Sequence, residues 1–436
     1  MTTTERICSV LALVLSVLQP LPLVAQKRPD PAVKASRKAG SGPSERARPE
    51  ARRYTIEQAV SDRAQLHTIA FNGLAFMTGD FGSDTFIPPG KVSDFFGFQY
   101  MRDIDAAGKG HNPMFLNRVA GNVLQILNED QRALFLEASW DQALQMETIA
   151  RMRWPVILAF DQELRGQRPE GRGALDPGAV SDHFSRIYAL DAELAFERAR
   201  VFGAVARSLT ESQRARLGDM QFGDFDSWPE VDREALQRQR PRGESKMVGV
   251  AYLTLASEFF SWQAGSIDAD VYFCPERHGT TFGGFYLKDL PAMGQKDFDI
   301  STSLTGDSGE AFLDLLNPDQ RARIESIIPR QRDALREIVS LRREIAGCLR
   351  GFLAGEPPDR EVVLELGRHY GELDGFLSFH YATAFAEIFR TLDLDQQATM
   401  LRLRNLDTNE MGNVFIFSQR VELADPLATD PFFTPL

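Results

Sequence analysis

Three soft metal ligands stand close together in the second half of the chain. Cys274 and His278 are four residues apart in FCPERHGTTF, and Met293 follows in DLPAMG. A thiolate, an imidazole and a thioether together suit copper or haem iron. The haem attachment sequence Cys-x-x-Cys-His does not occur, and the aligned stretch FIPPGKVSDF has Ile87 and Lys91 at the matching places. A metal- or haem-dependent redox protein is therefore one hypothesis for this chain.

Two irregular stretches share the pattern Phe-x-Pro-x6-Phe-x-Gly-Phe. Proline fixes the backbone, glycine permits close approach, and three aromatic residues in thirteen are too apolar for a free loop. One interpretation is an aromatic-lined pocket, and the other is a plug that fills the core between helices. The residues of the pattern are Phe86, Pro88, Phe95, Gly97 and Phe98 in the first stretch, and Phe273, Pro275, Phe282, Gly284 and Phe285 in the second.

A third group of potential ligands lies on one predicted helix face. Glu365, His369 and Glu372 are spaced i, i+4 and i+7. Di-iron sites in helical bundles use Glu-x-x-His pairs from two helices, which this spacing does not provide, so a solvated charged face is the favoured interpretation. The sequence also lacks G-x-S-x-G, H-E-x-x-H and a Walker loop. These patterns name no class of enzyme.

One short phrase recurs four times, as LNEDQ, LTESQ, LNPDQ and LDLDQ. In each copy a good N-cap residue follows a leucine, and a glutamine stands three positions after the cap. This is the spacing of a capping box, so each phrase predicts a helix start. The residues are Leu127, Asn128 and Gln131; Leu209, Thr210 and Gln213; Leu316, Asn317 and Gln320; and Leu392, Asp393 and Gln396.

The Leu-Thr-x-x-Gln phrase, followed by a basic amphipathic helix, resembles the motif of small periplasmic stress proteins of the Spy/CpxP kind. Leu209, Thr210 and Gln213 match it fully, whereas the other three copies have Asn or Asp in place of threonine. The resemblance implies a helical envelope protein that holds non-native chains or senses stress. It would place the phrases on the ligand-facing surface, whereas the capping interpretation makes them structural.

The two halves of the chain align with each other. The Phe/Pro/Gly stretches pair without a gap, and residues 187–213 pair with 370–396, including Leu190-Asp191 over Leu373-Asp374. Offsets of about 183 to 189 residues relate the halves. This order predicts a tandem duplication of an all-helical module, residues 54–235 and 236–412, related by a pseudo-two-fold axis. A C-terminal extension follows at 413–436.

Apolar residues within each half recur with helical rather than alternating spacing. Helices are expected at 55–78, 128–164 and 178–207, and at 244–264, 317–354 and 359–390. Each half carries a Pro/Gly/Phe-rich irregular insert, at 79–113 and 265–308. The predicted fold is mainly α.

The N-terminus predicts export. Residues 1–25 hold a short apolar run that ends in prolines, as in a secretory signal peptide. Residues 26–53 hold nine Lys or Arg against three acids and no aromatic residue, so we expect a disordered basic linker. The whole chain carries −12 and this linker +6, which leaves −18 on the body. An acidic body argues against nucleic-acid binding.

Two function classes follow from these patterns. The first is a periplasmic or secreted helical binding or chaperone-like protein, without a cofactor or chemistry of its own, whose partners are non-native proteins or a small apolar ligand. The second is the copper or haem redox protein that would use Cys274, His278 and Met293. After export only Cys274 and Cys348 remain, and the sequence leaves open whether they pair. No segment after the signal peptide is apolar enough to span a membrane.

Overall fold

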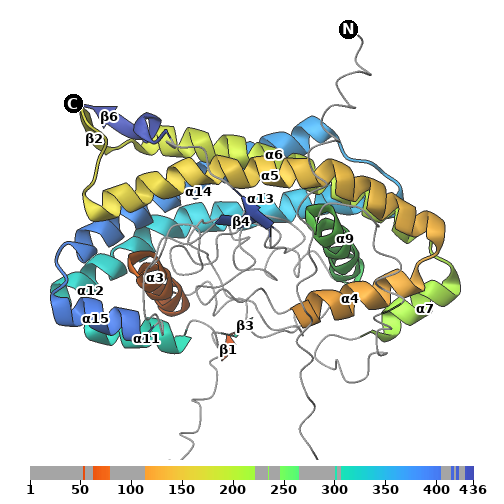
Figure 1. Cartoon of the computed structure of the whole chain (residues 1–436), viewed down its shortest axis with the longest axis horizontal. Coiled ribbons are helices and arrows are strands. Elements are labelled where there is room, and N and C mark those ends of the chain that lie inside the picture. The colour runs from red at the N-terminus through yellow and green to blue at the C-terminus, as the bar shows by residue number, and fades with distance from the viewer. Residues whose placement is uncertain are drawn as a thin grey trace, which may run out of the picture. The chain divides into compact units, whose positions relative to one another are not determined.

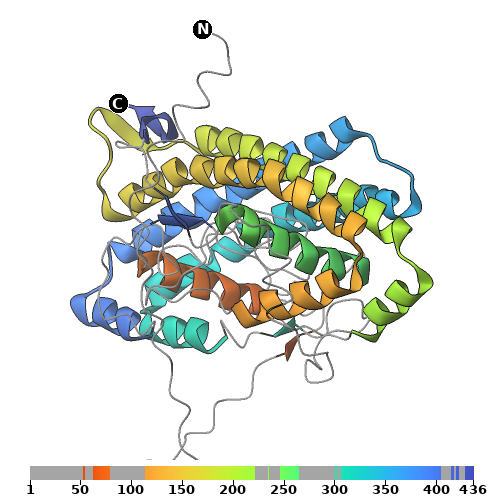
Figure 2. The same cartoon turned by 45° about the vertical axis from the view of Figure 1, so that its right-hand side comes forward.

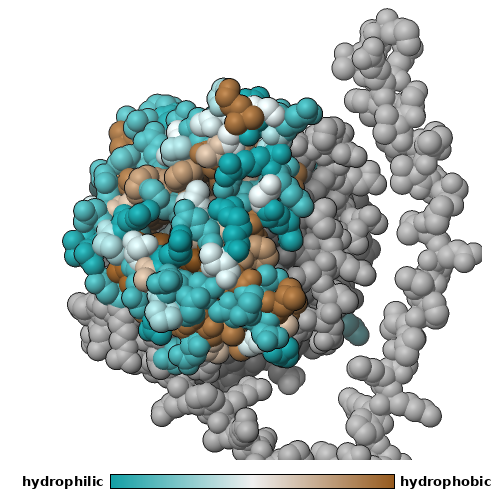
Figure 3. Space-filling model, turned by 90° about the vertical axis from the view of Figure 1, so that its left-hand side faces the viewer, coloured by the Kyte–Doolittle hydropathy of each residue, from teal (hydrophilic) through white to brown (hydrophobic). Residues whose placement is uncertain are grey.

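The fold is described by a computed structural model of the chain of 436 residues. The structure describes residues 53–54, 62–78, 113–220, 234, 246–264, 300–301, 306–403, 414–416, 419–421 and 428–436. Helices dominate this part of the chain, as the sequence predicts. No described helix combines the length and the apolar character that crossing a membrane requires. On the face in Figure 3 hydrophilic residues prevail, and hydrophobic residues form small separate groups.

Five helices pack together into what we call bundle A. They are α4 (Pro113–Ile126), α5 (Glu129–Arg165), α6 (Pro177–Ser208), α7 (Glu211–Asp219) and α9 (Lys246–Ala264). Helix α9 packs mainly on α4 and α5 (Figure 1). Its side chains Phe259 and Trp262 contact the ring of Phe202 on α6, with ring centroids 5.8 and 6.0 Å away. Aromatic contacts of this kind hold the centre of bundle A together.

Bundle B has the corresponding members. They are α3 (Asp62–Met77), α11 (Gly306–Leu315), α12 (Pro318–Glu325), α13 (Ile327–Ala354), α14 (Arg360–Phe389) and α15 (Leu394–Leu403). Helix α3 packs mainly on α11, as α9 packs on α4 (Figures 1 and 2). Phe76 on α3 contacts Phe385 on α14, with ring centroids 5.9 Å apart. Phe385 stands 183 residues after Phe202, so the two bundles repeat this contact.

The first helix of each predicted half packs with the other half. Helix α3 belongs by sequence to 54–235 but packs in bundle B, and α9 belongs to 236–412 but packs in bundle A. The short strand β1 (Arg53–Tyr54) likewise pairs with β3 (Ile300–Ser301), just before α11. Neither predicted half is therefore a self-contained packing unit. Residues Ala51–Leu436 form one compact unit. The tandem duplication and its pseudo-two-fold axis stay predictions.

The two bundles meet mainly where α6 crosses α14. The helices run antiparallel, since Gly367, Gly371 and Gly375 approach α6 in reverse order. A Cβ at Gly371 would lie 2.5 Å from the carbonyl oxygen of Phe184, and one at Gly375 would lie 2.7 Å from the Cα of Ser181. Only glycine permits such a close approach of two helix backbones.

The predicted helix 317–354 is broken. Helix α12 ends at Glu325 and α13 begins at Ile327. Pro329 has no N–H to donate to the carbonyl of Glu325, and the hydroxyl of Ser326 donates to the carbonyl of Arg323 at 2.7 Å. Helix α5 runs through a proline without a break. The interruption in bundle B therefore reflects the serine and the proline together.

The C-terminal residues return to bundle A. Strand β6 (Phe433–Pro435) pairs antiparallel with β2 (Arg172–Leu175), which lies between α5 and α6. The 3-10 helix η4 (Asp430–Phe432) places the ring of Phe432 4.9 Å from that of His183, and both Phe432 and Phe433 are buried. A further strand pair, β4 (Val414–Ile416) with β5 (Gln419–Val421), precedes this segment.

Candidate functional site

The first two phrases form capping boxes that face each other in bundle A. The Asn128 N–H donates to Gln131 Oε1, and the Gln131 N–H donates to Asn128 Oδ1, both at 2.9 Å. Thr210 and Gln213 make the same pair of bonds at the start of α7. The two glutamine amides also bond to each other, with Gln213 Nε2 2.8 Å from Gln131 Oε1.

Each of these amides also binds the carbonyl at the end of another helix. Gln131 Nε2 lies 3.2 Å from the Ser208 oxygen at the end of α6, and Gln213 Nε2 lies 2.9 Å from the Ile126 oxygen at the end of α4. These are carbonyls that a helix leaves without internal partners. One glutamine pair therefore joins two helix starts to two helix ends.

Bundle B contains the same joint. Gln320 and Gln396 close boxes with Asn317 and Asp393, and Gln396 Nε2 lies 2.9 Å from Gln320 Oε1. The Gln320 amide donates to the carbonyl of Thr391, just after the end of α14, and the Gln396 amide donates to the carbonyl of Leu315, the last residue of α11, both at 3.0 Å. Gln131 and Gln320 are each only 2 % exposed. The side-chain amides of the four glutamines are thus hydrogen-bonded to other groups within the protein. We call the two arrangements the glutamine joints.

A group of ionisable side chains is buried where the bundles meet. The α5 and α13 residues Arg153 and Arg342 are 189 positions apart, and the α6 and α14 residues Asp191 and Asp374 are 183 apart. All four are at most 2 % exposed. Unpaired charges would be very unfavourable at such depth, and each of the four residues has at least one interaction partner.

The tyrosines of the crossing supply some of those partners. The Tyr188 hydroxyl donates to Asp374, and the Arg342 guanidinium donates to the Tyr370 hydroxyl at 3.2 Å. The Tyr188 and Tyr370 rings meet edge to face at 4.6 Å. Burial, and then the charge of Asp374, raises the pKa of Tyr188 well above its usual value. This phenol therefore stays protonated and remains a hydrogen-bond donor.

Helices α9 and α3 each pack with the other predicted half, and we call them the exchanged helices. Each is also held by a buried polar contact. In bundle A the Arg198 guanidinium lies 2.9 Å from Glu258 on α9 and 2.8 Å from Gln142 on α5. In bundle B the corresponding contact is neutral: the Tyr381 hydroxyl donates to Gln331, whose amide donates to Gln65 on α3 at 3.0 Å. Tyr381 stands 183 residues after Arg198, and Gln331 stands 189 after Gln142.

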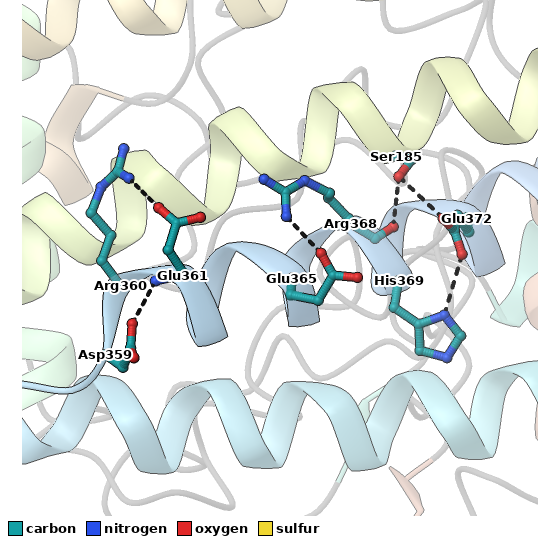
Figure 4. A network of polar contacts seen from close by, with 8 residues as sticks. All are labelled: Ser185, Asp359, Arg360, Glu361, Glu365, Arg368, His369 and Glu372. Atoms are coloured by element: carbon teal, nitrogen blue, oxygen red, sulfur yellow. Dashed lines mark hydrogen bonds and ion pairs between the residues drawn. The ribbon is translucent and has the colours of Figure 1, made fainter.

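The charged face of α14 is exposed, and its ionisable side chains are paired. Within α14, His369 lies 3.4 Å from Glu372, and Arg368 pairs with Glu365 at 2.6 Å (Figure 4). His369 also lies 2.7 Å from Glu337 on α13. The hydrogen bond to Glu337 is the main cause of a raised pKa at His369. Within the described ranges, no three His, Cys, Asp or Glu residues are grouped so as to hold a metal ion.

The other predicted sites lie outside the described residues. These are the aromatic pattern, Phe86, Pro88, Phe95, Gly97, Phe98, Phe273, Pro275, Phe282, Gly284 and Phe285, and the soft ligands Cys274, His278 and Met293. Cys348 is half-buried on α13 and carries a free thiol, whose pKa is raised by burial. His183 on α6 is half-buried, and its ring bonds to the Met152 carbonyl at 2.6 Å, which is a structural role.

Sequence reasoning missed two features that the structure brings together. It predicted each capping box but not the pairing of glutamines 82 and 76 residues apart. It also overlooked the buried Arg/Asp layer, although Asp191 and Asp374 stand in the aligned Leu-Asp pairs and carried a usable signal.

Comparison with known proteins gives no relative. No protein family matches the chain, and neither a curated protein nor a solved structure matches it.

Proposed function

We propose that the protein is an extracytoplasmic binding protein of the chaperone-like kind, which holds non-native polypeptide or a small apolar ligand and catalyses no reaction of its own. The observation that carries the proposal is that the glutamines of the repeated phrases are hydrogen-bonded to groups of the protein itself. The motif glutamines are consumed in the two glutamine joints, which fix helix ends to helix starts. The helices then serve as a rigid frame, and binding belongs to what this frame presents.

The connections of the frame support this division of roles. Residues 79–112 join α3 of bundle B to α4 of bundle A, and residues 265–299 join α9 of bundle A to β3 and α11. Both aromatic inserts therefore start in one bundle and end in the other. Binding residues commonly sit on connections that a rigid scaffold positions. On this proposal the Phe/Pro/Gly inserts contribute an apolar binding surface.

The compartment belongs to the same proposal. The predicted signal peptide and basic linker favour a periplasmic or secreted protein, and the resemblance to the Spy/CpxP motif favours a role in holding non-native chains. In this protein the glutamines of the phrases would act in joints rather than contact a client.

Two measurements on the mature protein test the proposal. The first follows light scattering by a chemically denatured, aggregation-prone protein after dilution into buffer with and without the purified chain. We expect suppression at near-stoichiometric ratios, and we expect Phe98→Ala together with Phe285→Ala to reduce it while the melting temperature stays within a few degrees. The second determines bound metal and the visible spectrum. A stoichiometric metal or a haem band would contradict the proposal and favour the redox hypothesis built on Cys274, His278 and Met293.

A further inference from the structure

The first half of α5 carries an exposed surface in which acidic and large apolar residues alternate. Leu134, Trp140 and Leu144 are 36 %, 46 % and 71 % exposed. Helical spacing puts these residues and three exposed carboxylates on one face about 21 Å long. We call this surface the acidic-apolar stripe; its members are Asp130, Leu134, Glu137, Trp140, Asp141 and Leu144.

Bundle B provides an internal control for the stripe. At the equivalent positions, 189 residues later, α12 and α13 carry Arg323, Pro329 and Asp333 in place of the three apolar residues, and Asp319, Ser326 and Arg330 in place of the three acids. All six are exposed. Bundle B packs with these residues, although its helix is interrupted at Ser326. Apolar side chains at the positions of Leu134, Trp140 and Leu144 are therefore not needed for a bundle of this kind to pack. Trp140 and Leu144 are neighbours on the helix surface, and adjoining exposed apolar side chains that the fold does not need are a candidate interaction surface.

The carboxylates of the stripe also differ from those further along α5. Glu147, Asp161 and Glu163 form ion pairs with Arg151, Arg165 and Arg168 at 2.6 to 2.8 Å. By contrast, Asp130, Glu137 and Asp141 form no ion pair with any residue that the structure describes. The stripe therefore offers negative charge beside apolar surface, which is complementary to a cationic, apolar partner.

We propose that the acidic-apolar stripe is a docking surface for polypeptide segments in which Lys or Arg alternate with large apolar side chains. This rests on the proposed function and names the chemistry of its client. Such a segment would bury Trp140 and Leu144 and place its cations beside the carboxylates. A second copy of the chain fits poorly, because a two-fold contact through the stripe would oppose acids with acids. An anionic lipid surface is disfavoured for the same reason.

A binding experiment with defined peptides tests the stripe. The probe is a fluorescein-labelled 14-residue peptide of alternating leucine and lysine, titrated with the full mature chain and followed by anisotropy. We expect Trp140→Ser with Leu144→Asp to weaken binding by about tenfold or more, since both substitutions remove a large apolar surface that would be buried against the peptide. Glu137→Gln with Asp141→Asn should weaken binding about threefold at low salt and less at high salt. The matched control is Leu394→Asp, which changes an apolar residue that is 82 % exposed on α15, and it should bind like the wild type.

The outcomes separate this inference from the proposed function. Circular dichroism and thermal melting first establish that each variant is folded. One outcome is that the wild type suppresses aggregation while the Trp140/Leu144 variant binds the leucine–lysine peptide as the wild type does. That result would contradict the docking role of the stripe and leave the proposed function standing. Equal affinity of the wild type for a leucine–glutamate peptide would overturn the charge part. A wild type that neither binds the peptide nor suppresses aggregation would overturn both.

Discussion

Bundles A and B share their joints but differ in how each holds its exchanged helix. Three features recur in both bundles: the glutamine pair, the phenylalanine of α6 or α14, and the buried arginine and aspartate. The residues are Phe202 and Phe385, Arg153 and Arg342, and Asp191 and Asp374. The buried polar contact of α9 is charged, between Arg198 and Glu258, whereas that of α3 is neutral, around Gln331. The ion pair of α3, between Asp62 and Arg332 of α13, is exposed. The features that recur are those that fix helix ends and crossings. The features that differ mark places where the frame accepts alternatives.

The largest expected effect comes from breaking the charged tie. Glu258→Leu leaves Arg198 buried without its carboxylate, so the free energy of unfolding should fall by about 3–5 kcal/mol. Urea denaturation measures this. Adding Arg198→Met should restore most of the loss, because an apolar pair replaces the ion pair. A double variant as unstable as the single one would show that the charge is not the cause.

The crossing of α6 and α14 gives the next effect. Position 371 holds glycine where the first half has Tyr188, and a methyl group there would lie 2.5 Å from the Phe184 carbonyl oxygen. Gly371→Ala should cost about 1–3 kcal/mol through forced separation of the helices. Gly249→Ala is the control on α9, where nothing lies within 4 Å of the added carbon. That substitution should be neutral or stabilise by up to about 1 kcal/mol. Equal effects of the two would argue against the close crossing.

A smaller effect tests whether the glutamines act as pairs. Gln131→Ala and Gln213→Ala should each destabilise by about 1–2 kcal/mol, because the partner amide and a helix-end carbonyl lose a bond. In a double-mutant cycle they should couple by at least about 0.5 kcal/mol. Gln320 and Gln396 should behave alike. Simple additivity in both bundles would mean that each box acts alone.

The smallest effect is a pH dependence that differs between the two crossing helices. The pKa of His369 on α14 is raised, mainly by Glu337, whereas the pKa of His183 on α6 is lowered, mainly by burial. Stability from His369 is therefore full below pH 6.5 and lost as pH rises through its folded pKa. Stability from His183 is present above pH 6.5 and lost as pH falls towards its folded pKa.

The two histidines can be separated by substitution. His369→Gln should reduce the fall in the free energy of unfolding above pH 6.5. The reduction should be less than about 1 kcal/mol, since the group is exposed. His183→Gln should reduce the fall on the acid side, below pH 6.5. Urea denaturation across pH 5 to 8 measures both changes. Curves that stay parallel to the wild type would contradict the assignment.

The sequence predicts the local features of this fold well and the long-range ones poorly. Capping boxes depend on residues three apart, so LTESQ and the three similar phrases of this chain identify helix starts. The pairing of Gln131 with Gln213 depends on tertiary packing, which no local pattern encodes. The exchange of α3 and α9 was equally invisible, because two similar helices fit either bundle by pattern alone. The break at Ser326 had a visible signal in Pro329. Arg153 and Arg342 were overlooked because charged residues are usually found at the surface.

The glutamines of the repeated phrases form joints and, on the proposed function, take no part in binding. The most direct test measures thermal melting and aggregation suppression on the same variant, Gln131→Ala with Gln213→Ala. We expect a clearly lower melting temperature, with aggregation suppression per mole unchanged at temperatures where the variant stays folded. An unchanged melting temperature together with lost suppression would contradict it and would make the phrases the functional surface.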